Sequence, residues 1–403
     1  MNKLYAFYCR AYQAVFRAAL PILPYREPIQ LDGLSSIVPL LAEKRIASVL
    51  LVTDASVRSL GLTSGLEAAL KAAGVACAVY DKTVPNPTIA NIEEGRALYL
   101  TAHAQAIIAV GGGSVMDCAK VIGARVAKPR QSVQRMRGLL RVLKRTPLLI
   151  AVPTTAGTGS ETTLAAVITD PAARHKYPIN DFALIPDYAV LDPELTRGLP
   201  PMLTATTGMD ALTHAIEGYT TKGAWELSDM FHFEAIKLIS ENLRDSVAEA
   251  KSGQPGSGRE GMALGQYVAG MGFSNVGLGI DHAMAHTLSA HYDTPHGVAC
   301  AMLLPIAMEF NKPVCAERLA KVAVAMGVDT TGMSTDEAAD AAIAAVKQLS
   351  ADVNIPHVCE AMKADEIEVL AKDAMADACF PGNPREATLD DVIELFKKIC
   401  PAA

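Results

Sequence analysis

AIIAVGGGSVMDCAK, residues 106–120, joins an apolar run, three consecutive glycines and a segment with helical character. Such a strand–loop–helix unit is typical of parallel sheets that bind a ligand at the carboxyl ends of their strands. Glycines let a phosphate approach the backbone, and the following helix offers unpaired N–H groups. The spacing is not G-x-G-x-x-G, however, and Ser114 and Asp117 have capping-box spacing, so ordinary helix initiation is the alternative interpretation.

Other apolar β-type runs alternate with helical patterns on both sides of this unit. We expect strands at Ala47–Thr53, Ala76–Tyr80, Ala106–Val110, Leu148–Val152, Ala165–Thr169 and Ala183–Leu191. We expect helices at Leu62–Ala73, Ile89–Ala104 and Val115–Ala127. This alternation predicts a mostly parallel, doubly wound sheet covered by helices on both faces.

Two further predicted strands end in residues that suit the same ligand. The run at Leu148–Val152 is followed by PTTAGTGSE, Pro153–Glu161, whose small and hydroxyl side chains allow close approach. Asp54 follows the strand at Ala47–Thr53, where a carboxylate can accept hydrogen bonds from ribose hydroxyls and repel a 2′-phosphate. A single Asp is more often a helix cap, and the hydroxyls can cap the next helix. Together, the three loops predict a nucleotide site.

The pattern changes near Asp192–Pro201, beyond which we find helical periodicity and no convincing strand. The expected helices are Met202–Tyr219, Glu226–Ala250, Arg259–Val276, Asp281–Ala290, Val298–Phe310, Cys315–Ala325, Thr335–Asp352, Ala364–Ala376 and Leu389–Ile399. Ser252–Gly258, SGQPGSG, is expected to be a surface loop between two of them. We therefore expect an N-terminal extension at residues 1–30, a dinucleotide-binding α/β domain at 31–196 and a helical metal-binding domain at 197–403.

Histidines gather in the helical half. The chain has nine, and four lie within fifteen residues: His282, His286, His291 and His296. Asp210 and His214 are four residues apart in a predicted helix, so one face carries both, and His282 and His286 repeat this spacing. His296 follows a proline and must project from a turn or a new helix start. A carboxylate with imidazoles suits Fe(II) or Zn(II). Four ligands would leave one of the five candidates spare, and the spacing does not identify it.

The bulk composition is that of a compact globular protein. The chain has 403 residues, half of them apolar, and a formal net charge of −7. Lys and Arg are spread along the chain without a basic stripe, so we expect no nucleic-acid partner. No two of the eight cysteines form a C-x-x-C pair, which favours reduced thiols in a cytoplasmic protein.

Six aromatic residues lie among the first 25 residues, interrupted by charges. These charges exclude a membrane span and a signal-peptide core. An amphipathic helix at a membrane surface is one interpretation. We prefer a helix packed on the protein body or on a neighbouring subunit.

Taken together, these motifs resemble the iron-dependent (group III) alcohol dehydrogenase family from about Leu31 to the C-terminus. In chain order they are VTD at Val52–Asp54, PNPT at Pro85–Thr88, GGGSVMDCAK at Gly111–Lys120, PTTAGTGSE at Pro153–Glu161, TGMDALTHAIEGY at Thr207–Tyr219, HAMAH at His282–His286, DTPHG at Asp293–Gly297 and NPREAT at Asn383–Thr388. One departure is Asp281, which precedes His282 where the family usually has an apolar residue. Asp281 could add charge beside the metal or point to solvent without effect.

The resemblance implies an N-terminal Rossmann-like domain and an all-α C-terminal domain, the architecture shared with dehydroquinate synthase. It implies the metal ligands Asp210, His214, His282 and His296, with Fe(II) or else Zn(II) in the cleft beside the nicotinamide. His286 matches the histidine proposed to relay protons. The implied dinucleotide contacts are Asp54, Gly112, Gly113, Ser114, Asp117, Thr154, Thr155, Thr158, Lys176 and Leu191.

The function implied is transfer of a hydride between an alcohol, or the corresponding aldehyde or ketone, and NAD(H), with Asp54 favouring NAD over NADP. A cytoplasmic homo-oligomer, a dimer or larger, is expected. Alternatives on the same fold are a maleylacetate-type reductase, a hydroxyacid–oxoacid transhydrogenase and a lyase resembling dehydroquinate synthase. A non-catalytic nucleotide-binding scaffold is the alternative from another class, and the intact ligand set disfavours it.

Overall fold

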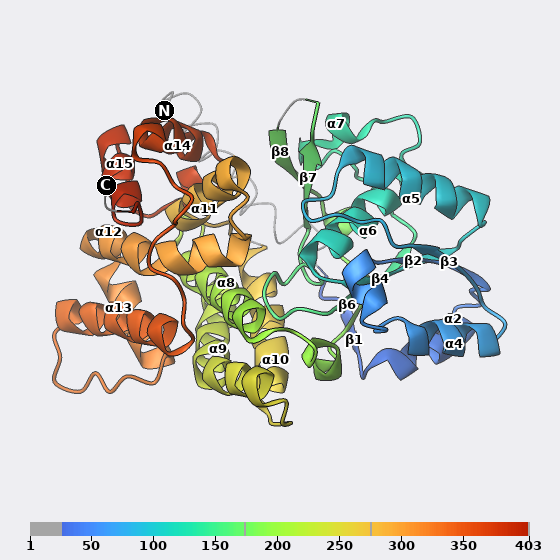
Figure 1. Cartoon of the computed structure of the whole chain (residues 1–403), viewed down its shortest axis with the longest axis horizontal. Helices are drawn as coiled ribbons and strands as arrows, with labels where there is room; N and C mark the ends of the chain where they lie inside the picture. Colours follow the sequence, from blue (N-terminus) through green and yellow to red (C-terminus); the bar gives the residue numbers. More distant parts are fainter. Residues whose placement is uncertain (1–25, 173–174, 275, 402–403) are drawn as a thin grey trace. The chain divides into compact units, whose positions relative to one another are not determined.

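The computed structural model describes residues 26–172, 175–274 and 276–401. The chain divides into two compact units at residues 198 and 199, and each is described by itself. The N-terminal unit contains β-strands and helices, and the C-terminal unit is helical (Figure 1). The helix expected among the first 25 residues lies outside the described residues.

Six parallel strands form the main sheet of the α/β unit. They are β1 (Ile29–Leu31), β2 (Ser48–Val52), β3 (Ala76–Tyr80), β4 (Ala106–Gly111), β6 (Leu148–Pro153) and β9 (Tyr188–Val190). Their order is β1-β9-β6-β4-β2-β3, and every neighbouring pair is parallel. The carboxyl ends of β2, β4 and β6 are therefore adjacent, which aligns the three loops that the sequence singled out.

Helices cover both faces of this sheet (Figure 1). They are α2 (Ile37–Glu43), α3 (Ala55–Ser59), α4 (Ser64–Ala72), α5 (Ile89–Thr101) and α6 (Gly113–Ala127). Along β4, Ile107 and Ala109 join the core that contains α5 and α6. Ile108 and Val110 join the opposite core with α2 and α4. Because both faces are buried, β4 is a continuous apolar run, and the doubly wound prediction is confirmed.

A second, three-stranded sheet was not foreseen. It has the order β5-β8-β7, with β5 (Gly138–Leu139), β7 (Ala165–Asp170) and β8 (His175–Asn180), and β7 runs antiparallel to β8. The strand expected at Ala183–Leu191 is shorter than predicted. A 3-10 turn at Phe182–Leu184 precedes β9, and Pro186 between them has no N–H for a strand ladder.

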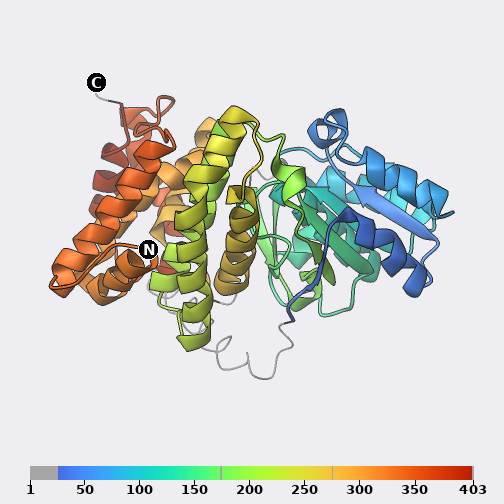
Figure 2. The ribbon, with the colours of Figure 1, turned by 90° about the horizontal axis from the view of Figure 1, so that it is seen from below.

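The C-terminal unit is built from α8 (Pro201–Thr220), α9 (Glu226–Ser252), α10 (Gly258–Phe273), α11 (Ile280–Tyr292), α12 (His296–Ala325), α13 (Thr335–Asp352), α14 (Ile367–Ala376) and α15 (Leu389–Lys397). No strand occurs among its described residues. Long helices of this unit, α9 and α10 among them, run side by side (Figure 2). The α-helical prediction is confirmed.

Helix α12 consists of two helices joined across a kink, in agreement with the two helices predicted at Val298–Phe310 and Cys315–Ala325. Its backbone is non-helical at Cys315, two residues after Pro313, because proline removes one helix hydrogen bond and crowds the preceding turn. Among the described residues, α12 alone is long and apolar enough to cross a membrane, but 61% of that window is buried inside the protein. It packs on α8, α11 and α13, as a core helix does.

Candidate metal centre and nucleotide loops

Four predicted ligands from three helices gather around one carboxylate oxygen, that of Asp210, in the helical unit. Asp210 and His214 lie one turn apart on α8, His282 lies in the first turn of α11, and His296 is the first residue of α12. Oδ1 of Asp210 is 3.9 Å from Nδ1 of His214, 3.8 Å from Nε2 of His282 and 3.7 Å from Nε2 of His296. Two donors about 2.0–2.3 Å from a shared ion are separated by about 3.3–3.8 Å at a tetrahedral angle. The spacing fits one divalent ion.

His282 gives the sharpest test of this fit. Its side chain is 1% exposed, and Nε2 has no hydrogen-bond partner among the described residues. Its other ring nitrogen, Nδ1, lies 2.7 Å from Oε2 of Glu217. A buried nitrogen without a partner is costly, and a carboxylate on the opposite nitrogen directs the Nε2 lone pair outward. Both features are those of a metal-ligating imidazole.

Glu217 was not singled out in the sequence. It lies on α8, and besides His282 its carboxylate accepts the backbone N–H groups of Gly279 and Asp281 at 3.1 and 2.8 Å. It therefore satisfies the free donors at the start of α11 while it orients a predicted ligand. Its position seven residues after Asp210, on the same helix face, was the available signal.

His214 is held by an aromatic neighbour. Its ring stacks on Phe273, the last residue of α10, with centroids 4.3 Å apart and an interplanar angle of 12°. His282 tilts against its other side at 4.5 Å. These contacts restrict the rotation of the ring and keep it beside Asp210.

His286 has a different environment from the four ligands. Its Nδ1 lies 2.9 Å from Oδ2 of Asp377, and its ring stacks on His296 at 5.2 Å. Burial raises the pKa of Asp377, but the imidazole of His286 and the Cys379 N–H lower it more, so the carboxylate stays ionised. No sequence pattern pointed to Asp377, which lies between α14 and a short 3-10 turn.

Asp281 and Cys300 are two further groups beside the predicted ligands. Asp281 is fully buried, so the expectation that it might point to solvent is wrong. Burial, with Glu217 and Asp210, raises the pKa of the Asp281 carboxyl well above its usual range. Cys300, one turn after His296, offers a sulfur that groups with ligand atoms of Asp210, His282 and His296, all within 4.8 Å of one another, and His214 is not part of this group. This thiol, an additional donor for a borderline metal, was not among the predicted site residues.

The glycine loop of the α/β unit lies against the second predicted loop. A Cβ on Gly113 would lie 2.8 Å from the side chain of Thr158, and one on Gly112 would lie 3.5 Å from Thr155. Gly112 is the N-cap of α6 and no side chain caps this helix, so the capping-box interpretation of Ser114 and Asp117 is wrong. An uncapped start of a 15-residue helix behind glycines suits a pyrophosphate.

Asp117 and Lys120 tie this loop to the rest of the unit. The Asp117 carboxylate accepts the Ser160 hydroxyl at 2.8 Å and the Val167 N–H at 2.8 Å. The buried Lys120 ammonium donates to Ser160 at 2.9 Å and to Ala165 O at 2.8 Å. Burial lowers the pKa of Lys120 to about 8. Asp117, predicted to contact the cofactor, therefore also positions the loop at Pro153–Glu161.

The remaining predicted contacts surround the same edge of the sheet. Asp54 follows β2, and its carboxylate accepts the Val57 N–H at 2.9 Å, so it does cap α3. Thr154 follows β6, and its N–H donates to Gly111 O at 3.0 Å. Leu191 follows β9, the strand beside β6.

Lys176 lies on β8, outside the main sheet, and reaches the same region through Asn86. The Lys176 ammonium lies 2.7 Å from Oδ1 of Asn86, and the N–H of Asn86 donates to the Ser114 hydroxyl at 3.3 Å. Asn86 was not singled out as a site residue, although it lies within the PNPT motif.

Two family descriptions together match most of the chain. Residues 30–193 match "Iron-containing alcohol dehydrogenase", and residues 204–400 match "Fe-containing alcohol dehydrogenase family, C-terminal".

Individual proteins are also similar over most of their length. Lactaldehyde reductase of Escherichia coli (strain K12) is 47% identical over 350 residues, 86% of this chain and 90% of that protein. NAD-dependent methanol dehydrogenase of Bacillus methanolicus is 39% identical over 350 residues, 86% of this chain and 91% of that protein. Among solved structures, an alcohol dehydrogenase from Oenococcus oeni superposes with a TM-score of 0.89 at 38% identity, covering 93% of this chain and 99% of that one.

Proposed function

The chain belongs to the iron-containing alcohol dehydrogenase family and is an alcohol–aldehyde oxidoreductase, and from this premise we propose that a small alcohol and NAD are its substrate and cofactor. The reaction is reversible hydride transfer between the alcohol, or the corresponding aldehyde or ketone, and NAD(H). The observation that carries the proposal is the convergence of three imidazole nitrogens to within 3.7–3.9 Å of one carboxylate oxygen of Asp210.

The proposed ligands of a divalent iron are Asp210, His214, His282 and His296, and zinc suits the same donors. When bound, the ion supplies Lewis acidity, which stabilises negative charge on an alcohol oxygen. The protein's part is to fix the donors before the ion arrives. Glu217 orients His282, and the stack with Phe273 restrains His214.

The proposed NAD contacts are Asp54, Gly112, Gly113, Ser114, Asp117, Thr154, Thr155, Thr158, Lys176 and Leu191. The uncapped N–H groups of α6 would face the pyrophosphate. NAD, when bound, accepts a hydride at its nicotinamide ring and NADH returns it. Asp54 caps α3, and its carboxylate would also accept a ribose hydroxyl and repel a 2′-phosphate.

His286 is the proposed proton carrier. Asp377 holds Nδ1 of His286 at 2.9 Å, which leaves Nε2 to take a proton from the alcohol. The ionised Asp377 carboxylate would stabilise the imidazolium that forms. The His286 side chain is 27% exposed, so it can pass the proton to water and accept one back for aldehyde reduction.

The small size of the substrate follows from the relatives' names, which specify lactaldehyde and methanol. We also propose a cytoplasmic homo-oligomer, a dimer or larger. The cysteines of the described part are all free, as expected in a reducing compartment. Light scattering during size-exclusion chromatography measures the oligomeric state.

The activity is tested with protein loaded anaerobically with Fe(II), by following NADH formation with a panel of small alcohols. His282→Ala should lose both bound metal and turnover, because Nε2 of His282 is one of the converging donors. The matched control is His291→Ala, which removes an imidazole from the same helix outside the cluster, where His291 pairs with the exposed Asp373. The His291→Ala control should keep both the bound metal and the turnover. Full turnover in metal-free His296→Ala protein, or no net NADH with any alcohol, would overturn the proposal.

A further inference from the structure

Basic residues are concentrated in one segment of the α/β unit, in contrast to the even spread expected from the sequence. Residues 128–145 contain seven Lys and Arg and no Asp or Glu: Lys128, Arg130, Arg135, Arg137, Arg141, Lys144 and Arg145. The chain as a whole is acidic, with a net charge of −7. Neither the metal cluster nor the nucleotide loops use this segment.

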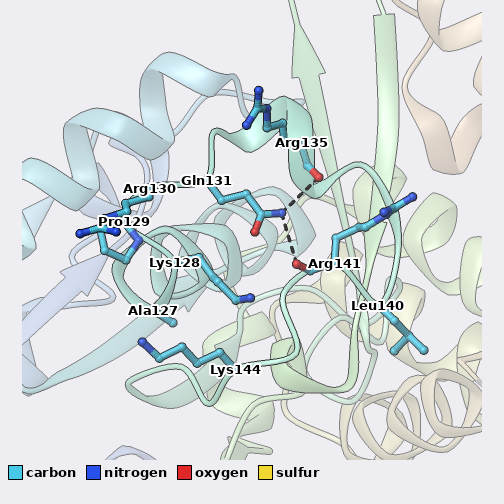
Figure 3. A pocket seen from close by; sticks show the side chains of 9 residues that line it. All are labelled: Ala127, Lys128, Pro129, Arg130, Gln131, Arg135, Leu140, Arg141 and Lys144. Atoms are coloured by element: carbon cyan, nitrogen blue, oxygen red, sulfur yellow. Dashed lines mark hydrogen bonds between the residues drawn. The ribbon is translucent and has the colours of Figure 1, made fainter.

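The segment lines a wide, open surface hollow of about 750 Å³. Five of its lining residues are cationic: Lys128, Arg130, Arg135, Arg141 and Lys144. The remaining lining residues are Ala127, Pro129, Gln131 and Leu140, and none is acidic or aromatic. In Figure 3 the side chains of Lys128 and Lys144 lie in the middle of the lining residues, and the guanidinium groups of Arg130, Arg135 and Arg141 lie farther out and point in different directions. A volume of this size suits a small molecule.

The five cations have no ion-pair partner among the described residues, although such pairs are frequent elsewhere in the chain. Arg137, which does not line the hollow, lies over the ring of Tyr177 instead. Two acidic side chains that bond to residues of this segment or to Arg125 are already engaged. Glu93 pairs with Arg125, and the buried Asp181 accepts the N–H groups of Val142 and Leu143. The positive charge around the hollow is therefore not neutralised by the protein.

Two side-chain donors, the buried Arg125 and the half-buried Gln131, hold the backbone of the segment in place. The guanidinium of Arg125 donates to Lys128 O at 2.9 Å and to Gln131 O at 2.7 Å. The Gln131 amide donates to Arg135 O and Arg141 O, each at 3.2 Å (Figure 3). Four carbonyl oxygens that would repel an anion are thus already bonded, and the segment is ordered before any ligand binds.

Stabilisation of a helix end does not account for the cluster. The segment follows the C-terminus of α6, where one or two cations are favourable. That effect fades within a turn, and Arg135, Arg141 and Lys144 lie well beyond α6. The glycine loop lies at the opposite end of this 15-residue helix, about 20 Å away at 1.5 Å per residue. The hollow is therefore separate from the nucleotide loops.

We propose that this hollow is a second binding site, which takes a small, multiply charged phosphate compound. Several like charges around a concave surface raise the local concentration of anions, and Lys and Arg are the side chains that bind phosphate. The absence of an aromatic residue in the lining excludes base stacking, which single-stranded nucleic acids require. A compact polyanion therefore fits better than a polynucleotide.

The test is calorimetric titration of the full-length, metal-loaded protein with inorganic tripolyphosphate. Saturating NAD is present throughout, so that the nucleotide loops are occupied. We expect one saturable site whose affinity falls as salt rises, because exposed charges are screened. In the variant Lys128→Ala/Lys144→Ala, binding should weaken at least tenfold.

The matched control is Lys71→Ala/Lys237→Ala, which removes two exposed lysines that do not line the hollow and changes the net charge equally. Its affinity should match that of the unmodified protein. Equal weakening in both variants, unchanged binding in Lys128→Ala/Lys144→Ala, or no saturable binding would overturn the proposal. Tighter binding of duplex DNA than of tripolyphosphate would overturn it as well.

A third variant keeps every charge. Gln131→Leu removes the donor to Arg135 O and Arg141 O, so the ordered backbone should loosen and tripolyphosphate should bind severalfold more weakly. If a folded Gln131→Leu protein binds tripolyphosphate with unchanged affinity, the hydrogen bonds from Gln131 to the backbone of the segment do not support binding. Circular dichroism of each variant shows whether it has folded.

Discussion

Asp54 performs two tasks that a single substitution can separate. Its carboxylate caps α3 through the Val57 N–H, and its charge is proposed to exclude a 2′-phosphate. Asn caps helices as well as Asp does but carries no charge. Asp54→Asn should therefore leave thermal stability nearly unchanged and raise kcat/KM for NADP relative to NAD about tenfold or more. Steady-state kinetics with both cofactors measures this ratio, and an unchanged ratio would exclude the repulsion.

Glu217 should control metal affinity without touching the metal. Glu217→Gln keeps the length of the side chain, but its amide cannot accept all the N–H groups that the carboxylate now binds. Loss of such an orienting partner typically costs 10–100-fold in metal affinity. Competition with a coloured chelator measures the affinity. The matched control is Glu226→Gln, at the start of α9, which should have no effect.

The residues that could bind the metal could be predicted from the sequence, but the residues that contact them in the folded protein could not. The i,i+4 spacing placed Asp210 and His214 on one helix face. It did not identify His286 as the histidine outside the ligand group, since that depends on how α8, α11 and α12 pack. Asp377 and Cys300 come from distant positions whose proximity only the folded helices create.

At the level of elements, α9 contains a buried titratable group. His232 is fully buried between α8 and α10, and a Cβ on Gly218 or Gly272 would lie 2.2 or 2.5 Å from its Nε2. Two glycines therefore make room for the ring. Burial, with a smaller contribution from Arg318, lowers the pKa of His232 from 6.5 to about 3.

This shift predicts a sensitivity to acid. Below pH 6.5 the unfolded chain binds a proton at His232 that the folded protein does not accept until about pH 3. Stability from this group is therefore present above pH 6.5 and falls by about 1.4 kcal/mol per pH unit below it. Urea unfolding at pH 7 and pH 5 should show a smaller loss for His232→Leu than for the unmodified protein. Identical losses would contradict the shift.

Elements with strong patterns were the predictable ones. Helix α13 matches its expected bounds, Thr335–Asp352, because Ser334 and Glu337 form a capping box at its start. Strands β2, β4 and β6 were found because buried parallel strands are uninterrupted apolar runs, and the half-buried edge strand β3 has an apolar run as well. The three-residue β1 and the polar, proline-containing β8 have no such signal, and their pairing partners determine them.

At the scale of the whole molecule, the two units should respond to different ligands. A ligand that binds only the folded state stabilises it by about 2.7 kcal/mol at 100 times its Kd. Differential scanning calorimetry should show that removing the metal with a chelator lowers the Tm of the helical unit. NAD should raise that of the α/β unit. Proteins truncated to one unit would misreport these effects, so the full chain is used. A shift of both unfolding transitions by either ligand would show that the two units unfold together.

Glu217 bonds both to the His282 ring and to backbone N–H groups at the start of α11, and these bonds link metal binding to the stability of that helix. The same carboxylate that directs His282 also secures the opening amides of α11, so a disturbed ligand should loosen that first turn. Deuterium uptake at Gly279 and Asp281 should accelerate in metal-stripped protein while uptake along α13 stays slow. Deuterium exchange in the first turn of α11 would then indicate whether the enzyme holds its metal ion.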